Sequence, residues 1–188
     1  MIHHRLASLY HHSYRATIAS DQDNARSKKL KQLSELHYGK ATSLFIALDM
    51  NAQAIRTILE RAGLLEASAN AGKYKTLLQI LDIILETKEV VHKIIERGPS
   101  DDNEEEERKM LETIVQRLQF TLLSIVKSGT TTNNVKSKKK GDKKSTSVEN
   151  VAVKELYGKT LKFNVNGENF TEELHKLLEY VAGERVNL

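Results

Sequence analysis

Apolar residues recur along this chain mainly at intervals of three and four positions, the spacing that places side chains on one face of an α-helix. Alternating apolar and polar runs of strand length are nearly absent, and one proline and nine glycines supply too few turn signals for an all-β fold. The first apolar stripe comprises Leu6, Leu9, Tyr10, Tyr14 and Ile18. The stripes together predict seven helices, at residues 1–18, 25–49, 51–67, 73–97, 100–127, 149–162 and 170–182.

The segment at residues 73–97, KYKTLLQILDIILETKEVVHKIIER, is apolar over more than half of its helical circumference. Such a helix must be covered on several sides, so we expect it at the centre of the fold. Gly98 and Pro99 predict its end, because glycine closes helices readily and proline cannot continue one. We therefore predict an all-α fold, an antiparallel array or bundle of about seven helices with degenerate tetratricopeptide-like packing. An open array and a closed bundle both satisfy this pattern.

Residues 128–149 interrupt the helical periodicity. They are rich in lysine, serine, threonine and asparagine, a composition typical of a disordered or mobile loop. We therefore expect residues 1–127 to form a helical-repeat-like bundle and residues 150–188 to form a C-terminal helical pair that completes the same domain. Asn169 and Glu172 have the spacing of a capping box at the start of the last helix.

The positive charge of the chain is concentrated in one segment. The net charge is +4, and without residues 135–144, VKSKKKGDKK, basic and acidic residues nearly balance. This segment is a candidate nuclear-import signal, or an electrostatic segment that binds nucleic-acid phosphates; alternatively, it is a passive linker that its charge keeps soluble. No aromatic residues interleave the lysines, so base stacking is not indicated. The candidate residues are Lys136, Lys138, Lys139, Lys140, Lys143 and Lys144.

The first twelve residues, MIHHRLASLYHH, contain four histidines. His4 and His11 share a helix face, but seven residues place them about 10.5 Å apart along the axis. Two ligands of one zinc ion need nitrogens within about 4 Å of each other. We therefore predict no metal site here and interpret these histidines as solvated or as helix-packing residues. The other three are isolated in the sequence: His37, His92 and His175.

Catalytic and cofactor-binding patterns do not occur in the sequence. It contains no cysteine, no zinc-protease or serine-hydrolase motif, and no glycine-rich phosphate loop. The acidic run at residues 101–107 is typical of a solvated helix start. We therefore expect neither an enzyme nor a cofactor, and no small-molecule substrate. No apolar stretch approaches the length of a membrane span, so we also expect no membrane association.

Two short patterns match those of tetratricopeptide helices, Leu6-Ala7-Ser8-Leu9-Tyr10 and Ala41-Thr42-Ser43-Leu44-Phe45. Longer stretches resemble, in order, the C-terminal, tetratricopeptide-containing region of the erythroid differentiation-related factor family. These stretches are HHRLASLYHHSYR, LHYGKATSLF, GKYKTLLQILDIILET, RLQFTLLSIVKS and VKELYGKTLK. The resemblance covers most of the chain, and its motifs are packing motifs, so no functional residue is carried over.

The resemblance implies a protein-protein interaction scaffold that is a fragment of a nuclear transcription regulator. The expected partners are other proteins and the missing N-terminal part of a longer chain, and the expected location is the nucleus, with the cytoplasm also possible. The alternative function is nucleic-acid or chromatin association through the basic loop at residues 135–144.

The N-terminal helix is expected to begin at Met1 without a capping residue before it, as if cut from a longer protein. In a complete array its exposed apolar side would pack against a preceding helix, since terminal repeats otherwise need polar caps. We therefore predict that this helix is the least stable part of the fold.

Overall fold

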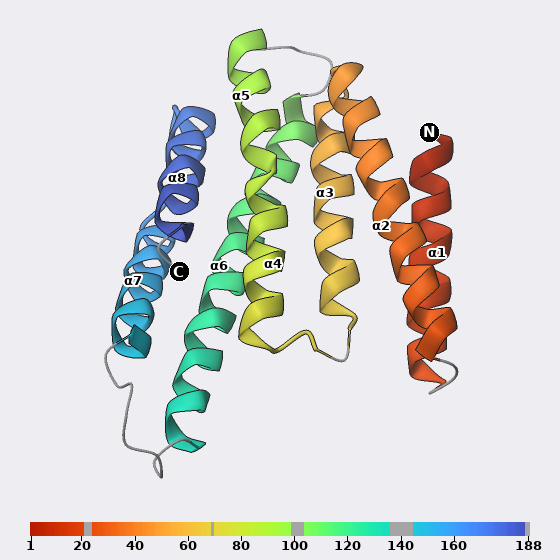
Figure 1. The fold of residues 1–188 in the computed structure, drawn as a ribbon. Coiled ribbons are helices and arrows are strands. Elements are labelled where there is room, and N and C mark those ends of the chain that lie inside the picture. The colour runs from red at the N-terminus through yellow and green to blue at the C-terminus, as the bar shows by residue number, and fades with distance from the viewer. Residues whose placement is uncertain (21–23, 69, 99–103, 136–144, 187–188) are drawn as a thin grey trace. The chain divides into compact units, whose positions relative to one another are not determined.

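The computed structural model describes residues 1–20, 24–68, 70–98, 104–135 and 145–186, which form α-helices and no β-strand (Figure 1). The predicted all-α class is therefore confirmed. None of the helices in this part of the chain is long and apolar enough to cross a membrane. The helices are α1 (Ile2–Ala19), α2 (Asn24–Ala47), α3 (Asn51–Glu66), α4 (Tyr74–Leu85), α5 (Thr87–Arg97), α6 (Glu104–Val135), α7 (Ser145–Leu161) and α8 (Phe170–Arg185).

The chain folds into two compact units, Met1–Ala71 and Gly72–Leu188. We call them the first unit, with helices α1 to α3, and the second unit, with helices α4 to α8. The boundary falls in the small-residue stretch ASANAG at residues 67–72, inside the segment 1–127 that we had expected to form one bundle.

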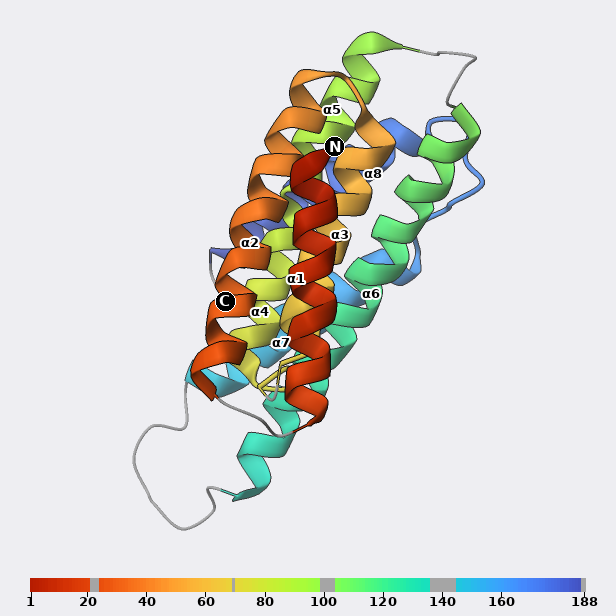
Figure 2. The ribbon, with the colours of Figure 1, turned by 90° about the vertical axis from the view of Figure 1, so that its right-hand side faces the viewer.

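In the first unit α1 packs against α2, and α2 packs against α3; Figure 2 shows α1 toward the viewer. The two outer helices of this series differ strongly in burial. Nine of the 16 residues of α3 are buried, whereas Ala7 and Tyr14 are the buried residues of the 18-residue α1. Apolar burial therefore fixes α3 firmly and α1 only lightly.

The turn between α2 and α3 depends on a left-handed backbone at Asp49, whose φ is 54°. Beyond it, the amide of Met50 donates a 2.9 Å hydrogen bond to the carbonyl of Phe45, which closes α2. Glycine adopts this conformation without the steric penalty of a Cβ atom. We expect Asp49→Gly to raise the free energy of unfolding of the first unit by about 0.5–1 kcal/mol, measured by urea denaturation. An equal gain in Asp49→Ala would contradict this explanation, because alanine keeps the Cβ atom.

In the second unit the predicted helix at 73–97 is divided into α4 and α5 at Glu86. The Glu86 amide donates to the carbonyl of Ile83, three residues back, at 3.2 Å. The Thr87 hydroxyl also donates to the carbonyl of Ile84 at 2.6 Å. If α4 and α5 are counted as the one helix expected at 73–97, the described residues form the predicted seven helices. Helix α4 packs against α6 and α8, and α5 packs against α8, as expected for a segment with neighbours on several sides.

The ends of the other helices in the second unit differ in part from expectation. Gly98 closes α5 as predicted, with a φ of 75°. Residues 128–135 and 145–149, which we had assigned to the loop, lie in α6 and α7; a single glycine inside a helix costs only about 1 kcal/mol. Residues 136–144 lie outside the described residues. The predicted capping box is not formed, because Asn169 makes no side-chain hydrogen bond to the start of α8.

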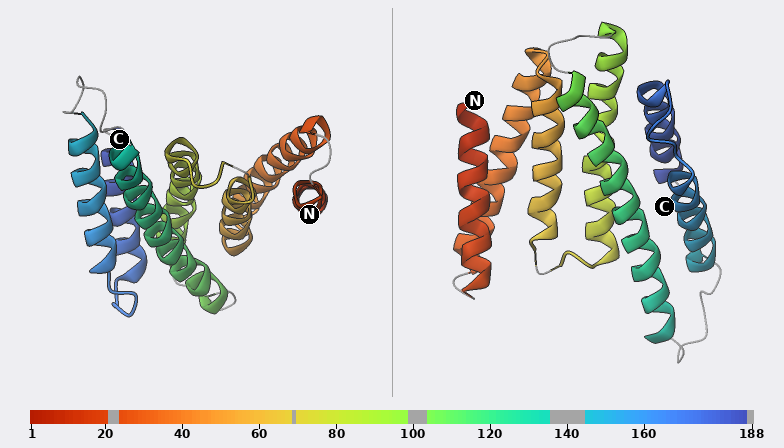
Figure 3. Two further views of the ribbon diagram at one scale, coloured as in Figure 1. Left: turned by 90° about the horizontal axis from the view of Figure 1, so that it is seen from below. Right: turned by 180° about the vertical axis from the view of Figure 1, so that it is seen from behind.

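The C-terminal helices α7 and α8 both contact α6 in the second unit. Helix α6 packs against α7, and α7 in turn contacts α8 (Figure 3). The buried residues of α8 recur at intervals of three and four, as the predicted amphipathic pattern requires: Phe170, Leu174, Leu178 and Val181. The pair thus joins α4, α5 and α6 in one core.

Candidate functional site

A pocket of about 240 Å³ lies in the second unit, where the C-terminal end of α5 meets the first turns of α6 and α8. We call it the α5–α6–α8 pocket. Its buried apolar lining includes Ile94, Leu111 and Phe170. The volume is below the roughly 300–1,000 Å³ typical of sites for drug-sized ligands and cofactors. The pocket therefore has room for one or two side chains of a bound segment.

One wall of the pocket is formed by a bidentate ion pair between α5 and α6. The Arg97 guanidinium donates to both carboxylate oxygens of Glu107, with Nη1–Oε1 at 2.9 Å and Nη2–Oε2 at 2.6 Å. The Glu107 residue is only 5% exposed, and a buried carboxylate requires such a partner. The pair therefore locks the end of α5 to the first turn of α6 and neutralises the buried charge.

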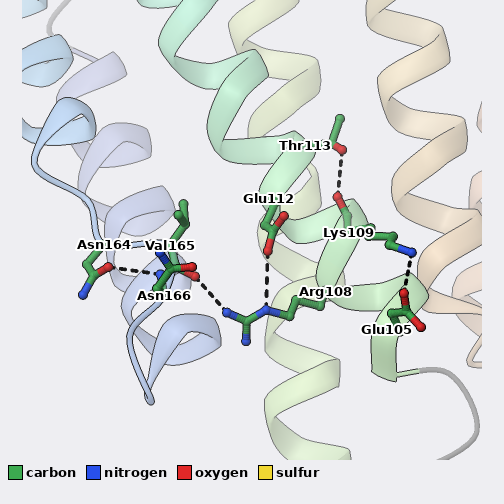
Figure 4. A network of polar contacts seen from close by, with 8 residues as sticks. All are labelled: Glu105, Arg108, Lys109, Glu112, Thr113, Asn164, Val165 and Asn166. Atoms are coloured by element: carbon green, nitrogen blue, oxygen red, sulfur yellow. Dashed lines mark hydrogen bonds and ion pairs between the residues drawn. The ribbon is translucent and has the colours of Figure 1, made fainter.

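Arg108 ties α6 to the turn before α8 (Figure 4). Its Nη2 donates to the carbonyl of Val165 at 2.9 Å, and its Nε lies 3.4 Å from Oε1 of Glu112. Its guanidinium carbon also lies 5.3 Å from the ring centroid of Phe170, a cation–π distance. These three contacts position the start of α8 at the edge of the pocket.

The turn that Arg108 holds is also stabilised internally. The amide of Asn166 donates to the side-chain oxygen of Asn164 at 3.0 Å, an arrangement that asparagine commonly makes in turns. The turn lies in the sequence FNVNGEN at 163–169, between α7 and α8.

The first turn of α6 also carries an exposed ion pair between Lys109 and Glu105, at 2.6 Å (Figure 4). A hydrogen bond from the ammonium group lowers the pKa of Glu105, and the same bond raises the pKa of Lys109. Exposed pairs of this kind add little stability. Glu105 thus behaves as the solvated residue expected of an acidic helix start, whereas Glu107, two positions on, does not.

The lining of the pocket carries more acidic than basic side chains. Its arginines are Arg97 and Arg108, and its glutamates are Glu104, Glu107, Glu168 and Glu172. Glu104, Glu168 and Glu172 are exposed. The pocket thus combines an apolar lining with a partly solvated, negatively charged edge.

The seven histidines of the chain are distributed over both units. In the first unit His3, His4 and His11 contact residues of α2 or α3, and His12 is exposed. In the second unit the rings of His92 and His175 stack at 5.2 Å. In the described part of the chain, no group of three or more histidine, aspartate or glutamate side chains is arranged to hold a metal ion.

The six candidate lysines lie outside the residues that the structure describes: Lys136, Lys138, Lys139, Lys140, Lys143 and Lys144. Their role as an import or electrostatic segment therefore stays a prediction. The residues of the pocket, in contrast, were not identified as a site from the sequence.

Comparison with known proteins agrees with the resemblance seen in the sequence. A family model described as "Erythroid differentiation-related factor 1-like, TPR repeats" matches residues 1–185. Proteins named erythroid differentiation-related factor 1 are similar to the chain: that of Mus musculus is 37% identical over 67% of this chain, and that of Pongo abelii is 31% identical over 97%. That of Homo sapiens is 34% identical over 67%. No solved structure matches the chain significantly.

The matched region is a small part of those relatives. The chain spans 12% of the Mus musculus protein and 17% of the Pongo abelii protein. Tetratricopeptide repeats stack helix pairs into surfaces that bind other proteins, so the match indicates a protein of the interaction-scaffold type. With the family model covering nearly its whole length, the chain belongs to the erythroid differentiation-related factor 1-like family of tetratricopeptide-repeat proteins.

Proposed function

We propose that this chain is a protein-protein interaction scaffold within a nuclear regulator of transcription. The family supports the scaffold, and the resemblance and the lysine-rich segment support the nuclear location. The α5–α6–α8 pocket is the observation that carries the proposal, because its volume fits one or two inserted side chains. Partner proteins would be other proteins of the nucleus and further parts of a longer chain.

The pocket favours binding of a partner segment through a few anchor residues. Such recognition places apolar side chains in a groove and uses polar groups at its edge to fix the register. The apolar contact would come from Ile94, Leu111 and Phe170. The polar groups at the edge would be the exposed carboxylates of Glu168 and Glu172.

Charge reversal at the edge tests this proposal. We expect the double variant Glu168→Lys, Glu172→Lys to lose capture of a defined set of nuclear-extract proteins by about tenfold, equivalent to about 1.4 kcal/mol. Both positions are exposed, so the fold should persist, as circular dichroism would verify. The measurement is quantitative mass spectrometry of proteins bound to the immobilised full chain.

Glu155→Lys, at an exposed position of α7 away from the pocket lining, is the matched control. It should capture the same proteins as the wild type. If the double variant and this control retain identical sets, the pocket is not the binding site.

The alternative function is association with nucleic acid or chromatin through residues 135–144. It is favoured by six lysines within ten residues, since each neutralised phosphate releases counterions and makes affinity fall steeply with salt. Changing the six lysines to glutamine should abolish this binding and leave protein capture intact. Duplex DNA affinity that is unchanged between low and moderate salt would exclude it.

A further inference from the structure

The docking of α1 on the rest of the first unit depends on histidines. Only Ala7 and Tyr14 are buried in α1, so apolar contact provides little of its attachment. Three histidines of α1 form side-chain hydrogen bonds to α2 or α3, and the Ser34 hydroxyl of α2 donates a further one to the backbone of α1. We propose that α1 is a pH-sensitive cover of α2, which is released when these histidines become protonated.

The first contact joins His3 of α1 to His37 of α2, with their Nδ1 atoms 2.8 Å apart. Such a bond needs one nitrogen with a proton and one without. If both rings were protonated, two N–H groups would face each other at this distance and the bond would be lost. Desolvation lowers the pKa of His3, and the neighbouring His37, Lys40 and terminal amino group lower it further. All groups that influence His3 thus oppose its protonation.

The second contact joins Nδ1 of His11 to the hydroxyl of Tyr38 on α2, at 3.0 Å. The other ring nitrogen, Nε2, is buried and has no hydrogen-bond partner among the described residues. A second proton would place a charged N–H group at this unpartnered position, which is costly. Burial lowers the pKa of His11, with Arg15 and His12 acting in the same direction and Glu60 against them.

Deprotonation of Tyr38 cannot offset the cost of protonating His11. Burial raises the pKa of Tyr38 to about 12, and Glu60 on α3 acts in the same direction. The phenol therefore stays neutral across the physiological range, so loss of the Tyr38 proton does not compensate for protonation of His11.

The third contact has the opposite response to acid. Nε2 of His4 lies 2.9 Å from Oε2 of Glu60, so a protonated His4 would form an ion pair with this carboxylate. Two of the three histidine contacts thus weaken on protonation and one strengthens. The net balance favours release of α1 in acid, and His4 limits the extent.

The sign of the pH dependence follows from linkage. A histidine with a lowered pKa in the folded state binds fewer protons there than in the unfolded state, near its ordinary value of 6.5. The stability that it contributes is present above pH 6.5 and is lost progressively as the pH falls from that value through the lowered pKa of the folded state. Released α1 would uncover the face of α2 that carries Tyr38 and Ser34, whose hydroxyl donates to the carbonyl of Ala7 at 3.0 Å.

Hydrogen exchange of the full chain at pH 7.5 and pH 5.5, corrected for intrinsic exchange rates, tests this proposal. We expect protection of the α1 amides to fall by about tenfold or more at the lower pH, whereas protection within α3 stays nearly constant. Unchanged protection of α1 relative to α3 would overturn the proposal.

Substitutions at the histidines of α1 distinguish the effect of their protonation from a general destabilisation of the fold by acid. His3→Gln combined with His11→Phe should remove most of the pH dependence of α1, and His4→Gln should increase it. His12→Gln is the matched control, because His12 is an exposed histidine of the same helix. An equal effect of His12→Gln and of the double variant would contradict the assignment.

A titration of the wild-type protein does not depend on the folding of any variant. In NMR spectra of the histidine rings, the pKa values of His3 and His11 should lie below the ordinary histidine value of about 6.5. Midpoints at or above that value for both rings would overturn the proposal.

Discussion

Replacing Ile58 with alanine is expected to lower the free energy of unfolding of the first unit by about 3 kcal/mol. Ile58 lies in the middle of α3 and is fully buried. Truncating a buried isoleucine removes its transfer free energy and leaves a cavity, a change that costs roughly 2–5 kcal/mol in well-packed cores. Urea denaturation followed by circular dichroism and by hydrogen exchange of α3 would measure the loss.

Leu9 is the control for this substitution. It lies on α1 and is 59% exposed, so Leu9→Ala should change stability by less than about 0.5 kcal/mol. A loss at Ile58 no larger than the loss at Leu9 would show that α3 is not the core element of the first unit.

Replacing Glu107 with alanine is expected to destabilise the second unit by about 2–3 kcal/mol. Breaking a buried ion pair costs roughly 3–5 kcal/mol, and the Arg97 side chain is 31% exposed, so water compensates part of the loss. The change also removes a constraint between α5 and α6. Urea denaturation at neutral pH would measure the difference.

Two further substitutions define the origin of that effect. Glu105→Ala, in the same turn but exposed, should cost less than about 0.5 kcal/mol. A double-mutant cycle with Arg97→Ala isolates the pair itself, and a coupling energy near zero would mean that the loss arises elsewhere.

The helical class was predictable because the apolar stripes are long and regular. The division of the 73–97 helix was not, since it is a local change in backbone hydrogen bonding, in which the Glu86 amide donates three residues back to Ile83, and it leaves the apolar pattern unchanged. The boundary between the two units was likewise hidden, because the stretch at 67–72 looks like any other helix connection.

The pocket was missed because its lining comes from three helix ends separated in the sequence. One signal was nevertheless present in the acidic run. Glu107 lies on the apolar stripe that continues through Leu111, Ile114 and Leu118, at steps of four, three and four. A carboxylate in that register is expected to be buried and to need a basic partner, which the structure identifies as Arg97.

The histidines show a different limit of sequence reasoning. Spacing along one helix predicts the separation of His4 from His11, but it carries no information on neighbours from another helix. His37 lies 34 positions from His3, and only the packing of α1 on α2 brings their rings together.

The Arg97–Glu107 pair makes the covalent connection between α5 and α6 partly redundant. Residues only ten positions apart are already held by two charge-assisted bonds, so the backbone between them adds little to the enthalpy that joins the helices. A chain severed between Gly98 and Glu104 should therefore keep α5 and α6 associated through this ion pair.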